Sequence, residues 1–489
     1  MEDNALHLPV HAKNLVNGQW VGTDQTIEVY NPANKQLVGT VPAAGASLVE
    51  ESLQAAAKAF PSWSRLTAQA RARLLRKAAQ IVRERKEHIS RLLTMEQGKP
   101  LVDARKEVEE AAYVLEYFAE EGVRIYGEMI PVDHPAARSL VIRQPVGPIA
   151  AITPWNYPVS LLAWKVAPAL AAGCTVVAKP ATETPLSPIA YIQCLADAGI
   201  PAGVVNIVTG RGSTAGDALI GSPLVKKIAF TGSTEIGKEV MRKAADHLSL
   251  VSLELGGHSP FIVMADADLE QAAQDGARRA FRAMGQNCNS VNRIYVHESI
   301  YKRFVELLVE FSSRLKMGDG LKNPDIDLGP MVNEQGIRRI EDQVRDALEH
   351  GGKLLLGGKR PDAPELQNGY FYEPTIIAEA GPGAKVLREE SFAPIVHVQP
   401  FATTEEVIRL ANDNPYGLVS YLYTNDLSNA ILISEALESG TVCVNNTVGS
   451  TVEAPYGGWK ASGIGVELSH YGIESYTHLK HIRLQLRGL

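Results

Sequence analysis

Residues 147–179 read GPIAAITPWNYPVSLLAWKVAPALAAGCTVVAK and contain the pattern that decides the fold. A short apolar segment at 147–153 is followed by a longer one at 159–172 and by a second short one at 175–179. We predict a strand, a helix and a strand in that order. Apolar strands that alternate with helices are typical of a parallel sheet covered by helices on both faces.

The same alternation continues along the chain. We predict further strands at 204–208, 227–231 and 249–255, helices at 187–198 and 236–245, and a short helix near residue 215. A second α/β pattern begins at residue 259, with strands at 293–297 and 393–398 and helices at 299–315 and 335–350. The sequence therefore predicts an α/β protein, long enough for two or three domains.

The segments after these strands are the places to look for a ligand, because parallel sheets bind ligands at the carboxyl ends of their strands. Gly232, Ser233 and Thr234 open a helix in this position, and the N-terminus of a helix suits a phosphate. The alternative is an ordinary N-cap, in which a hydroxyl satisfies the helix itself. The segment GRGSTAG at 210–216 is a weak near-match to a dinucleotide fingerprint, with one residue too many.

A cysteine in a polar loop is the main candidate for a nucleophile. Cys288 follows a predicted helix at 269–284 and has Gln286, Asn287 and Asn289 around it. Neighbouring donors lower the pKa of a thiol, so we expect a reactive thiolate, with an ordinary loop cysteine as the alternative. Glu254 ends an apolar strand upstream, where a carboxylate is costly unless it is paired or used.

Composition narrows the class of protein. The net charge of −7 disfavours general binding to nucleic acids. We expect no membrane attachment, because no run of about 18 apolar residues is present, and no secretory signal. Four scattered cysteines and twelve histidines without an HExxH pattern predict neither a disulfide framework nor a metal site. A cytoplasmic location fits these features.

Two segments predict strands outside the alternating patterns: SLVIR at 139–143 and YTHLKHIRLQL at 476–486. Strands with open edges invite pairing with another chain. They pair either with another subunit or with each other inside one chain.

Seven ordered motifs resemble the aldehyde dehydrogenase superfamily. They are TPWNYP (153–158), KPATETP (179–185), FTGSTEIG (230–237), ELGG (254–257), GQNC (285–288), EESFAP (389–394) and PYGGWKASGIG (455–465). Two more, EQGKP (96–100) and EYFAEEGVRIYGE (116–128), are similar to the succinate-semialdehyde dehydrogenase-like branch. The resemblance implies NAD(P)-dependent oxidation of an aldehyde to a carboxylic acid.

It also implies a division of the chain. A Rossmann-type NAD(P)-binding domain would take residues 1–123 and 146–256, and an α/β catalytic domain residues 257–457. A β oligomerisation flap with the C-terminal tail would take residues 124–145 and 458–489. Strand exchange through the flap implies a homo-oligomer, either a dimer or a homotetramer, and predicts that deleting residues 476–489 breaks it.

The catalytic roles are likewise those that the resemblance implies. Cys288 would attack the aldehyde carbon and form a thiohemiacetal, whose oxyanion is stabilised by the side-chain amide of Asn156 and the backbone N–H of Cys288. After hydride transfer, Glu254 would activate the water that hydrolyses the thioester. A glutamate there implies a free acid as the product, because coenzyme-A-acylating relatives lack it. Lys165 matches a lysine near the active site and is implied in proton handling.

The cofactor contacts implied by the resemblance come from residues spread along the chain. They are the backbone of Ile152 and Thr153, Trp155, Lys179 at the adenosine ribose, Gly232 and Ser233 at the pyrophosphate, Leu255, Glu390 at the nicotinamide ribose, and Phe392 against the ring.

Thr182 departs from the pattern of strict NAD users, which have a glutamate there. The small hydroxyl leaves room for a 2′-phosphate and Lys179 supplies positive charge, so we expect NADP to be accepted, alone or together with NAD. Glu183 opposes this if its side chain points inward.

The substrate signals conflict. Succinate-semialdehyde enzymes resemble one another in two pocket arginines, but this chain has only Arg282, with Trp164 at the other position. Arg282 suits a carboxylate, phosphate or sulfonate, or else forms a structural salt bridge. The remaining pocket residues implied are Tyr157, Ser450, Thr451 and Tyr456. We expect a short aldehyde with an anionic end; the alternatives are an apolar or aromatic aldehyde, for which Trp164 is typical, and a cysteine esterase without redox activity.

Overall fold

The apolar alternation at 147–179 folds as predicted. In the computed structural model, which describes residues 8–487, β8 (Pro148–Ile152) and β9 (Thr175–Lys179) are parallel neighbours joined by α5 (Ser160–Ala172). Every residue of these three elements is buried. A helix that is packed on all sides needs no polar face, which explains why α5 is apolar all around.

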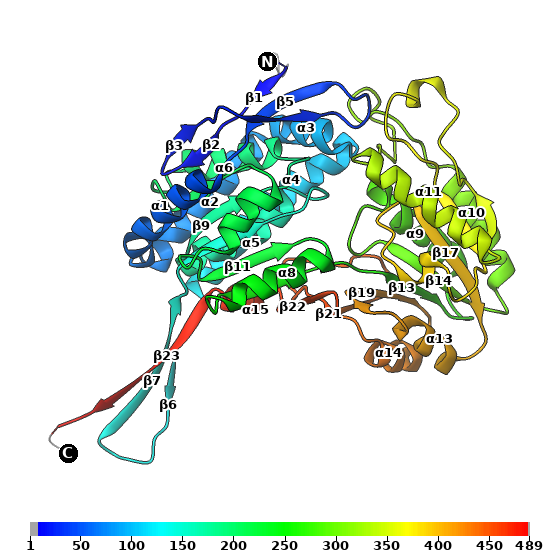
Figure 1. Cartoon of the computed structure of the whole chain (residues 1–489). Helices are drawn as coiled ribbons and strands as arrows, with labels where there is room; N and C mark the ends of the chain where they lie inside the picture. The colour runs from blue at the N-terminus through cyan, green and yellow to red at the C-terminus, as the bar shows by residue number, and fades with distance from the viewer. Residues whose placement is uncertain (1–7, 488–489) are drawn as a thin grey trace.

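The first body is built on an eight-stranded sheet with the order β22-β12-β11-β8-β9-β10-β2-β3 (Figure 1). Its parallel part comprises β12 (Leu250–Glu254), β11 (Lys227–Thr231), β8, β9 and β10 (Val205–Ile207). Antiparallel strands complete the edges: β2 (Asn14–Val16), β3 (Gln19–Val21) and β22 (Gly463–Ile464). The carboxyl ends of β8, β9, β11 and β12 therefore meet along one edge.

Helices cover this sheet. They are α1 (Ala46–Ser64), α2 (Ala68–Glu84), α3 (Lys86–Gln97), α4 (Leu101–Val123), α6 (Leu186–Asp197), α7 (Asp217–Ile220) and α8 (Thr234–Ala245). A small sheet of β1 (Val10–His11), β5 (Leu37–Pro42) and β4 (Thr26–Tyr30) lies at the N-terminal end. The helix predicted near residue 215 is a π-helical turn, Gly212–Gly216, that continues into α7.

The second body has a seven-stranded sheet with the order β15-β16-β17-β14-β13-β19-β20. The strands are β13 (Ser259–Val263), β14 (Val291–His297), β15 (Lys353–Leu356), β16 (Thr375–Ala378), β17 (Ile395–Phe401), β19 (Val419–Tyr423) and β20 (Thr441–Val444). The helices around it are α9 (Leu269–Phe281), α10 (Tyr301–Ser313), α11 (Glu334–Glu349), α12 (Lys385–Arg388), α13 (Thr404–Asn412) and α14 (Leu427–Ala436). Figure 1 shows the two bodies side by side, with the second running from green through yellow to orange.

The chain returns to the first body near its C-terminus. β18 (Tyr416–Gly417) pairs with β21 (Trp459–Lys460), and β22 then pairs antiparallel with β12. The helix α15 (Ser469–Glu474) follows and leads into the last strand. Residues 459–464 thereby connect the two bodies, and Gly463 is the strand partner of Glu254.

The two peripheral strands pair with each other within the chain, and their pairing with another subunit stays a prediction. β7 (Ala137–Pro145) lies between β23 (Thr477–Gln485) and β6 (Glu128–Ile130) in an antiparallel sheet that extends away from both bodies (Figure 1). Met129 and Leu479 are exposed on it, at 69% and 64% of their surface. Within residues 8–487, no helix has both the length and the apolar character needed to cross a membrane.

Candidate active site

Cys288 lies in the loop between α9 and β14, where two cavities meet. The predicted helix at 269–284 ends earlier, at Phe281, because Ala283, Met284 and Gly285 take left-handed φ angles of 52°, 60° and 66°. Left-handed non-glycine residues are costly and persist only where the surroundings hold them. At Gly285 a Cβ atom would lie 2.1 Å from the carbonyl oxygen of Ala393, so only glycine fits there.

The surroundings of the thiol differ from the sequence expectation. The Sγ atom lies 3.4 Å from the hydroxyl of Tyr456 and 3.7 Å from Oδ1 of Asn287, which is an acceptor. Burial, followed by the negative charge of Glu254, raises the pKa of the Cys288 thiol well above its ordinary value. The prediction that neighbouring amides lower this pKa is wrong, because burial of the thiol and then the charge of Glu254 raise it. The thiol therefore needs a base to remove its proton.

Glu254 ends β12 and supplies such a base. It is 2% exposed, and its two carboxylate oxygens have no well-directed hydrogen-bond partner among the described residues. Burial raises the pKa of Glu254 to about 8; the charge of Glu467 adds to this, and that of Lys165 opposes it. A carboxylate with such a pKa is poised to exchange protons near neutral pH.

A close chain crossing brings Glu254 to the cysteine loop. At Gly257, three residues after Glu254, a Cβ atom would lie 2.1 Å from the carbonyl oxygen of Cys288. Any other residue would push these two segments apart. Gly257 is thus required by the approach of the two catalytic candidates.

Asn156 lies between the two cavities and lines both. It is 3% exposed, and its Nδ2 atom donates to the carbonyl oxygen of Gln286 at 3.1 Å. This bond holds the side-chain amide beside the cysteine loop, the position that an oxyanion donor requires.

A buried ion pair holds the loop that carries Asn156. Lys99 and Glu107 are each 1% exposed at the side chain and bonded to one another. Lys99 Nζ also donates to the carbonyl oxygen of Asn156 at 2.8 Å and lies 3.8 Å from the centre of the Tyr157 ring. The other carboxylate oxygen of Glu107 accepts from the backbone N–H groups of Val159 and Ser160 at 2.9 and 3.3 Å. Sequence reasoning missed this role, although the motif at 96–100 contains Lys99.

The first cavity, of about 210 Å³, lies on the sheet side of Cys288. The predicted cofactor residues among its lining are Trp155, Gly232, Ser233, Leu255, Glu390 and Phe392. Glu390 Oε1 accepts from the N–H of Gly257 at 2.9 Å, and the rings of Trp155 and Phe392 meet edge-to-face at 5.3 Å. An aromatic pair, small residues at a helix N-terminus and a carboxylate able to accept from hydroxyls suit a nicotinamide nucleotide.

Four other predicted cofactor residues lie outside this cavity. Ile152, Thr153 and Lys179 are buried at the ends of β8 and β9, and burial lowers the pKa of Lys179. Thr182 donates from Oγ1 to Glu183 at 3.1 Å and lines a neighbouring hollow of about 360 Å³ together with Arg211. Glu183 lines both spaces. The Ser233 hydroxyl accepts from the N–H of Ile236 at 3.4 Å, so it is also an N-cap.

The second cavity, of about 350 Å³, lies on the other side of Cys288. Tyr157, Trp164, Arg282, Ser450 and Tyr456 line it as predicted. Thr451 is exposed and is absent from its lining. Lys165 is fully buried behind both cavities, where its Nζ donates to Thr231 at 2.6 Å and to Glu467 at 2.7 Å.

Three arginines line the second cavity, and only one was predicted. Arg282 is 36% exposed and lies 3.6 Å from Asp103, a weak pairing. Arg278 is exposed, whereas Arg279 is buried and bonded to the carbonyl oxygen of Asn289 and the hydroxyl of Tyr421. The density of arginine in RRAFR at 278–282 was the signal that could have found them.

Comparison with known proteins identifies the family. Residues 20–482 match the family model described as "Aldehyde dehydrogenase family". The chain belongs to the aldehyde dehydrogenase family. It is therefore an oxidoreductase that acts on aldehydes with NAD or NADP, as the sequence predicted.

Several relatives of this aldehyde dehydrogenase are similar over almost their whole length. It is 44% identical to a succinate-semialdehyde dehydrogenase [NADP(+)] of Escherichia coli (strain K12), covering 96% of this chain and 97% of that protein. It is 43% identical to a 3-sulfolactaldehyde dehydrogenase of Pseudomonas putida, covering 96% of each. A betaine aldehyde dehydrogenase of Staphylococcus aureus, solved with NAD⁺, is 36% identical with a TM-score of 0.95, over 98% of this chain and 95% of that chain. The predicted resemblance to the succinate-semialdehyde branch is confirmed.

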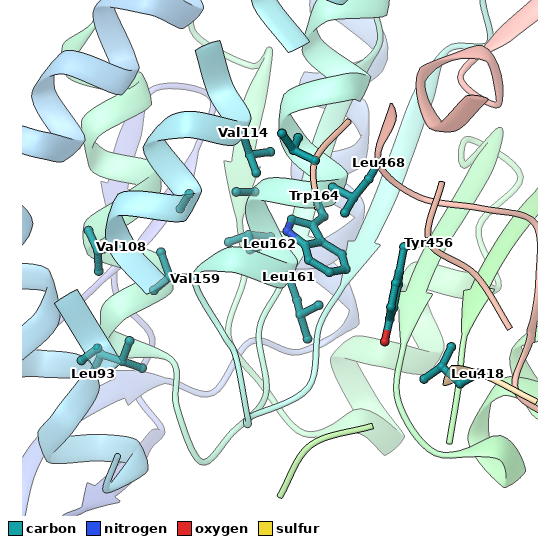
Figure 2. Packing of buried hydrophobic residues seen from close by; sticks show 14 of the residues in the cluster. Leu93, Val108, Val114, Val159, Leu161, Leu162, Trp164, Leu418, Tyr456 and Leu468 are labelled. Carbon is teal, nitrogen blue, oxygen red and sulfur yellow. The ribbon is translucent and has the colours of Figure 1, made fainter. Parts of the chain in front are cut away.

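One side of this aldehyde dehydrogenase's second cavity carries a feature that sequence reasoning missed. Figure 2 shows Trp164 with its ring toward Tyr456, and the two rings meet at 5.4 Å. The indole Nε1 donates to Glu110, on α4, at 3.2 Å. Glu110 lines the cavity as well. Within residues 8–487, no group of three or more metal-binding side chains is present.

Proposed function

We propose that this enzyme oxidises a short aldehyde with an anionic end to the carboxylic acid, using NADP or NAD. The observation that carries the proposal is the guanidinium group of Arg282 in the cavity that contains Cys288, with Arg278 beside it. Guanidinium binds carboxylate, phosphate or sulfonate bidentately. Relatives named for succinate-, glutarate- and sulfolactaldehyde, all anionic aldehydes, support the same substrate class.

The residues around Cys288 assign the chemical steps. Glu254 takes the thiol proton, directly or through water, and the sulfur attacks the aldehyde carbon. The resulting oxyanion lies within reach of the Asn156 amide and the backbone N–H of Cys288, a type of contact worth about 10²–10³-fold in rate per donor. A nicotinamide nucleotide held by Trp155, Glu390 and Phe392 in the first cavity would supply the hydride acceptor. Glu254 first releases the thiol proton to solvent, then removes a proton from the water that attacks the thioester and passes it to the leaving sulfur, which releases the acid and restores the thiol.

Substitution of Arg282 tests the substrate class. We expect Arg282→Leu to lower kcat/KM for succinate semialdehyde about 10- to 100-fold, the usual loss for a charge-assisted contact, and to leave a neutral aliphatic aldehyde unaffected. Arg303→Leu is the matched control, because Arg303 is an exposed arginine that pairs with Glu306 on α10. Rates are followed by NAD(P)H absorbance. If the parent prefers the neutral aldehyde and Arg282→Leu changes nothing, the anionic substrate class is wrong.

An apolar or aromatic aldehyde is the second candidate, favoured by the Trp164–Tyr456 pair in the same cavity. Benzaldehyde in the same series of assays separates the two. A preference for benzaldehyde that Trp164→Arg abolishes would support this candidate.

The preference for NADP rests on the hollow beside the first cavity. Thr182 leaves it open and Arg211 adds positive charge, whereas Glu183 opposes a phosphate. We expect Thr182→Glu to lower the NADP/NAD ratio of kcat/KM about tenfold or more, because a carboxylate repels the 2′-phosphate. Thr182→Ser is the control. An unchanged ratio in Thr182→Glu would place the 2′-phosphate elsewhere.

A further inference from the structure

The carboxylate of Glu110 faces the substrate cavity on the same side as Trp164. Glu110 is an exposed residue of α4 and lines the cavity that contains Cys288 and Arg282. One of its oxygens, Oε1, accepts from the indole N–H of Trp164 at 3.2 Å. A carboxylate has two oxygens and about four acceptor positions, so one indole N–H leaves most of its capacity for a ligand.

The same cavity thus offers two opposite kinds of contact. Arg278 and Arg282 present positive charge, and Glu110 presents an acceptor. A substrate whose only polar end group is a carboxylate or sulfonate pairs with the arginines. It gives Glu110 no hydrogen-bond donor and places a second negative charge near it. A substrate with a protonated amine would suit Glu110, but the neighbouring guanidinium groups repel it. An uncharged donor, a hydroxyl, satisfies Glu110 without either conflict.

We propose that Glu110 is a substrate-recognition residue that accepts a hydrogen bond from a hydroxyl group of the substrate. The preferred substrate is then a short hydroxyaldehyde whose other end is anionic. This inference rests on the proposed function for the anionic end and adds the hydroxyl to it.

Trp164 gives the carboxylate a fixed direction. Its indole donates to Glu110, and its ring packs against Tyr456, whose hydroxyl is 3.4 Å from the Cys288 sulfur (Figure 2). The wall from Glu110 to Cys288 is therefore a continuous series of packed side chains. A hydroxyl near this wall lies beside the aldehyde end, with the anionic end toward the arginines of α9 and the turn that follows it.

Desolvation of the carboxyl group against the cavity wall, and then the charge of Glu107, raise the pKa of Glu110 to about 7; the Trp164 hydrogen bond and the charge of Arg282 oppose this rise. Assays are therefore made at an alkaline pH, where the carboxylate is ionised. Recognition of a hydroxyl by an ionised acceptor is then tested directly.

The test compares two aldehydes that differ by one hydroxyl: 3-sulfopropanal and 2-hydroxy-3-sulfopropanal. We expect kcat/KM of the parent to favour the hydroxylated aldehyde about 10- to 100-fold, because the deoxy analogue leaves the acceptor unpaired. Glu110→Ala should bring the ratio close to one. Glu110→Gln, which retains an acceptor for Trp164, should give an intermediate ratio.

Two further variants separate recognition from packing. Glu109→Gln changes the adjacent glutamate of α4, which pairs with Arg83 and Lys86 away from the cavity, and should leave the ratio unchanged. Trp164→Phe removes the indole donor but keeps Glu110, and the preference for the hydroxylated aldehyde should persist. Thermal melting of each variant shows whether it is folded. If Glu110→Ala does not fold, the comparison is made with Glu110→Gln instead.

The possible failures are distinguishable. A parent that oxidises both sulfonated aldehydes at equal kcat/KM overturns the hydroxyl inference and leaves the proposed function intact. A ratio that survives in Glu110→Ala also overturns it. Activity on neutral aldehydes alone means that the proposed function itself has failed.

Discussion

The two cavities that meet at Cys288 share Cys288 and Asn156 but are built from different parts of the fold. The first is lined mainly by residues at the ends of parallel strands and at helix starts, with Glu183, Glu254 and Glu390 as its carboxylates. The second takes its charged groups from helices and a turn: Glu110 from α4, and Arg278, Arg279 and Arg282 from the end of α9 and the turn after it. The strand ends thus carry the chemistry, and the helices carry the selection of substrate.

The charges of the two sides follow from this difference. Burial raises the pKa of Glu254 to about 8 and that of Glu390 to about 7, so the first side can hold or release protons near neutral pH. The second side instead presents the guanidinium groups of Arg278 and Arg282, which suit an anionic group of the substrate. Changes on the first side should therefore alter turnover, and changes on the second side should alter which aldehyde is turned over.

The largest effect is expected at Glu254. Glu254→Gln should lower steady-state turnover about 10³-fold, because a general base contributes about 10²–10⁴-fold to such a step. Rapid mixing should show a first turnover of NAD(P)H formation that is slowed less than the steady state, since the thioester accumulates. Cys288→Ala is the control and should give no first turnover. A uniform slowing of both phases would mean that Glu254 acts before hydride transfer only.

The next largest effect is expected at the buried pair that holds the Asn156 loop. Lys99→Met should lower kcat about 10- to 100-fold with a smaller change in KM for the aldehyde, because the oxyanion donor loses its position. The control is Arg293→Met, which also removes a buried cation bonded to backbone carbonyl oxygens, those of His258 and Ala411, away from both cavities. It should lower the melting temperature without this loss in kcat. Equal losses in both variants would show that Lys99 only stabilises the fold.

A smaller effect concerns stability and pH. The pKa of Glu254 rises from 4.5 to about 8 on folding, so the folded chain keeps a proton that the unfolded chain releases between these values. The contribution of Glu254 to the free energy of unfolding therefore falls as the pH rises from 4.5 to about 8. Glu254→Gln should match the parent in melting temperature near pH 4.5 and exceed it increasingly toward pH 8. A constant difference across this range would mean that the group is not desolvated as described.

Truncation of the flap should have the smallest effect on the cavities, because no flap residue that the structure describes lines either of them. Tyr476 is buried, and its carbonyl oxygen accepts from the N–H of Val146. A truncation that removes residues 478–489 keeps Tyr476 and therefore disturbs the first body less than deletion of residues 476–489. The parent is expected to be a dimer or tetramer, and the truncated chain to have a lower mass by light scattering, with the ratio between aldehydes unchanged. A truncated chain that kept the parent mass would contradict the role of the flap in assembly.

Sequence reasoning found most of the predicted residues of both sides but missed several charged groups of the second. Cys288, Glu254 and Asn156 stand in short motifs at strand ends, where the residue type itself indicates the chemistry, and the structure brings all three together. Lys165 and Thr451, implied by the same resemblance, lie outside both cavities. Glu110 and Lys99 come from helices far from Cys288 along the chain, and nothing in their local sequence indicates that they face it.

The sequence by itself determined the parallel sheets, the family and the proposed catalytic residues, because apolar periodicity and short motifs are local properties. Tertiary structure alone decided the pKa directions of Cys288 and Glu254, which depend on burial and on charges from other segments. It also decided that the peripheral strands pair within one chain, and that a carboxylate and several guanidinium groups share one cavity. Such contacts join residues distant in sequence, and only the packing of helices against the sheets brings them within range.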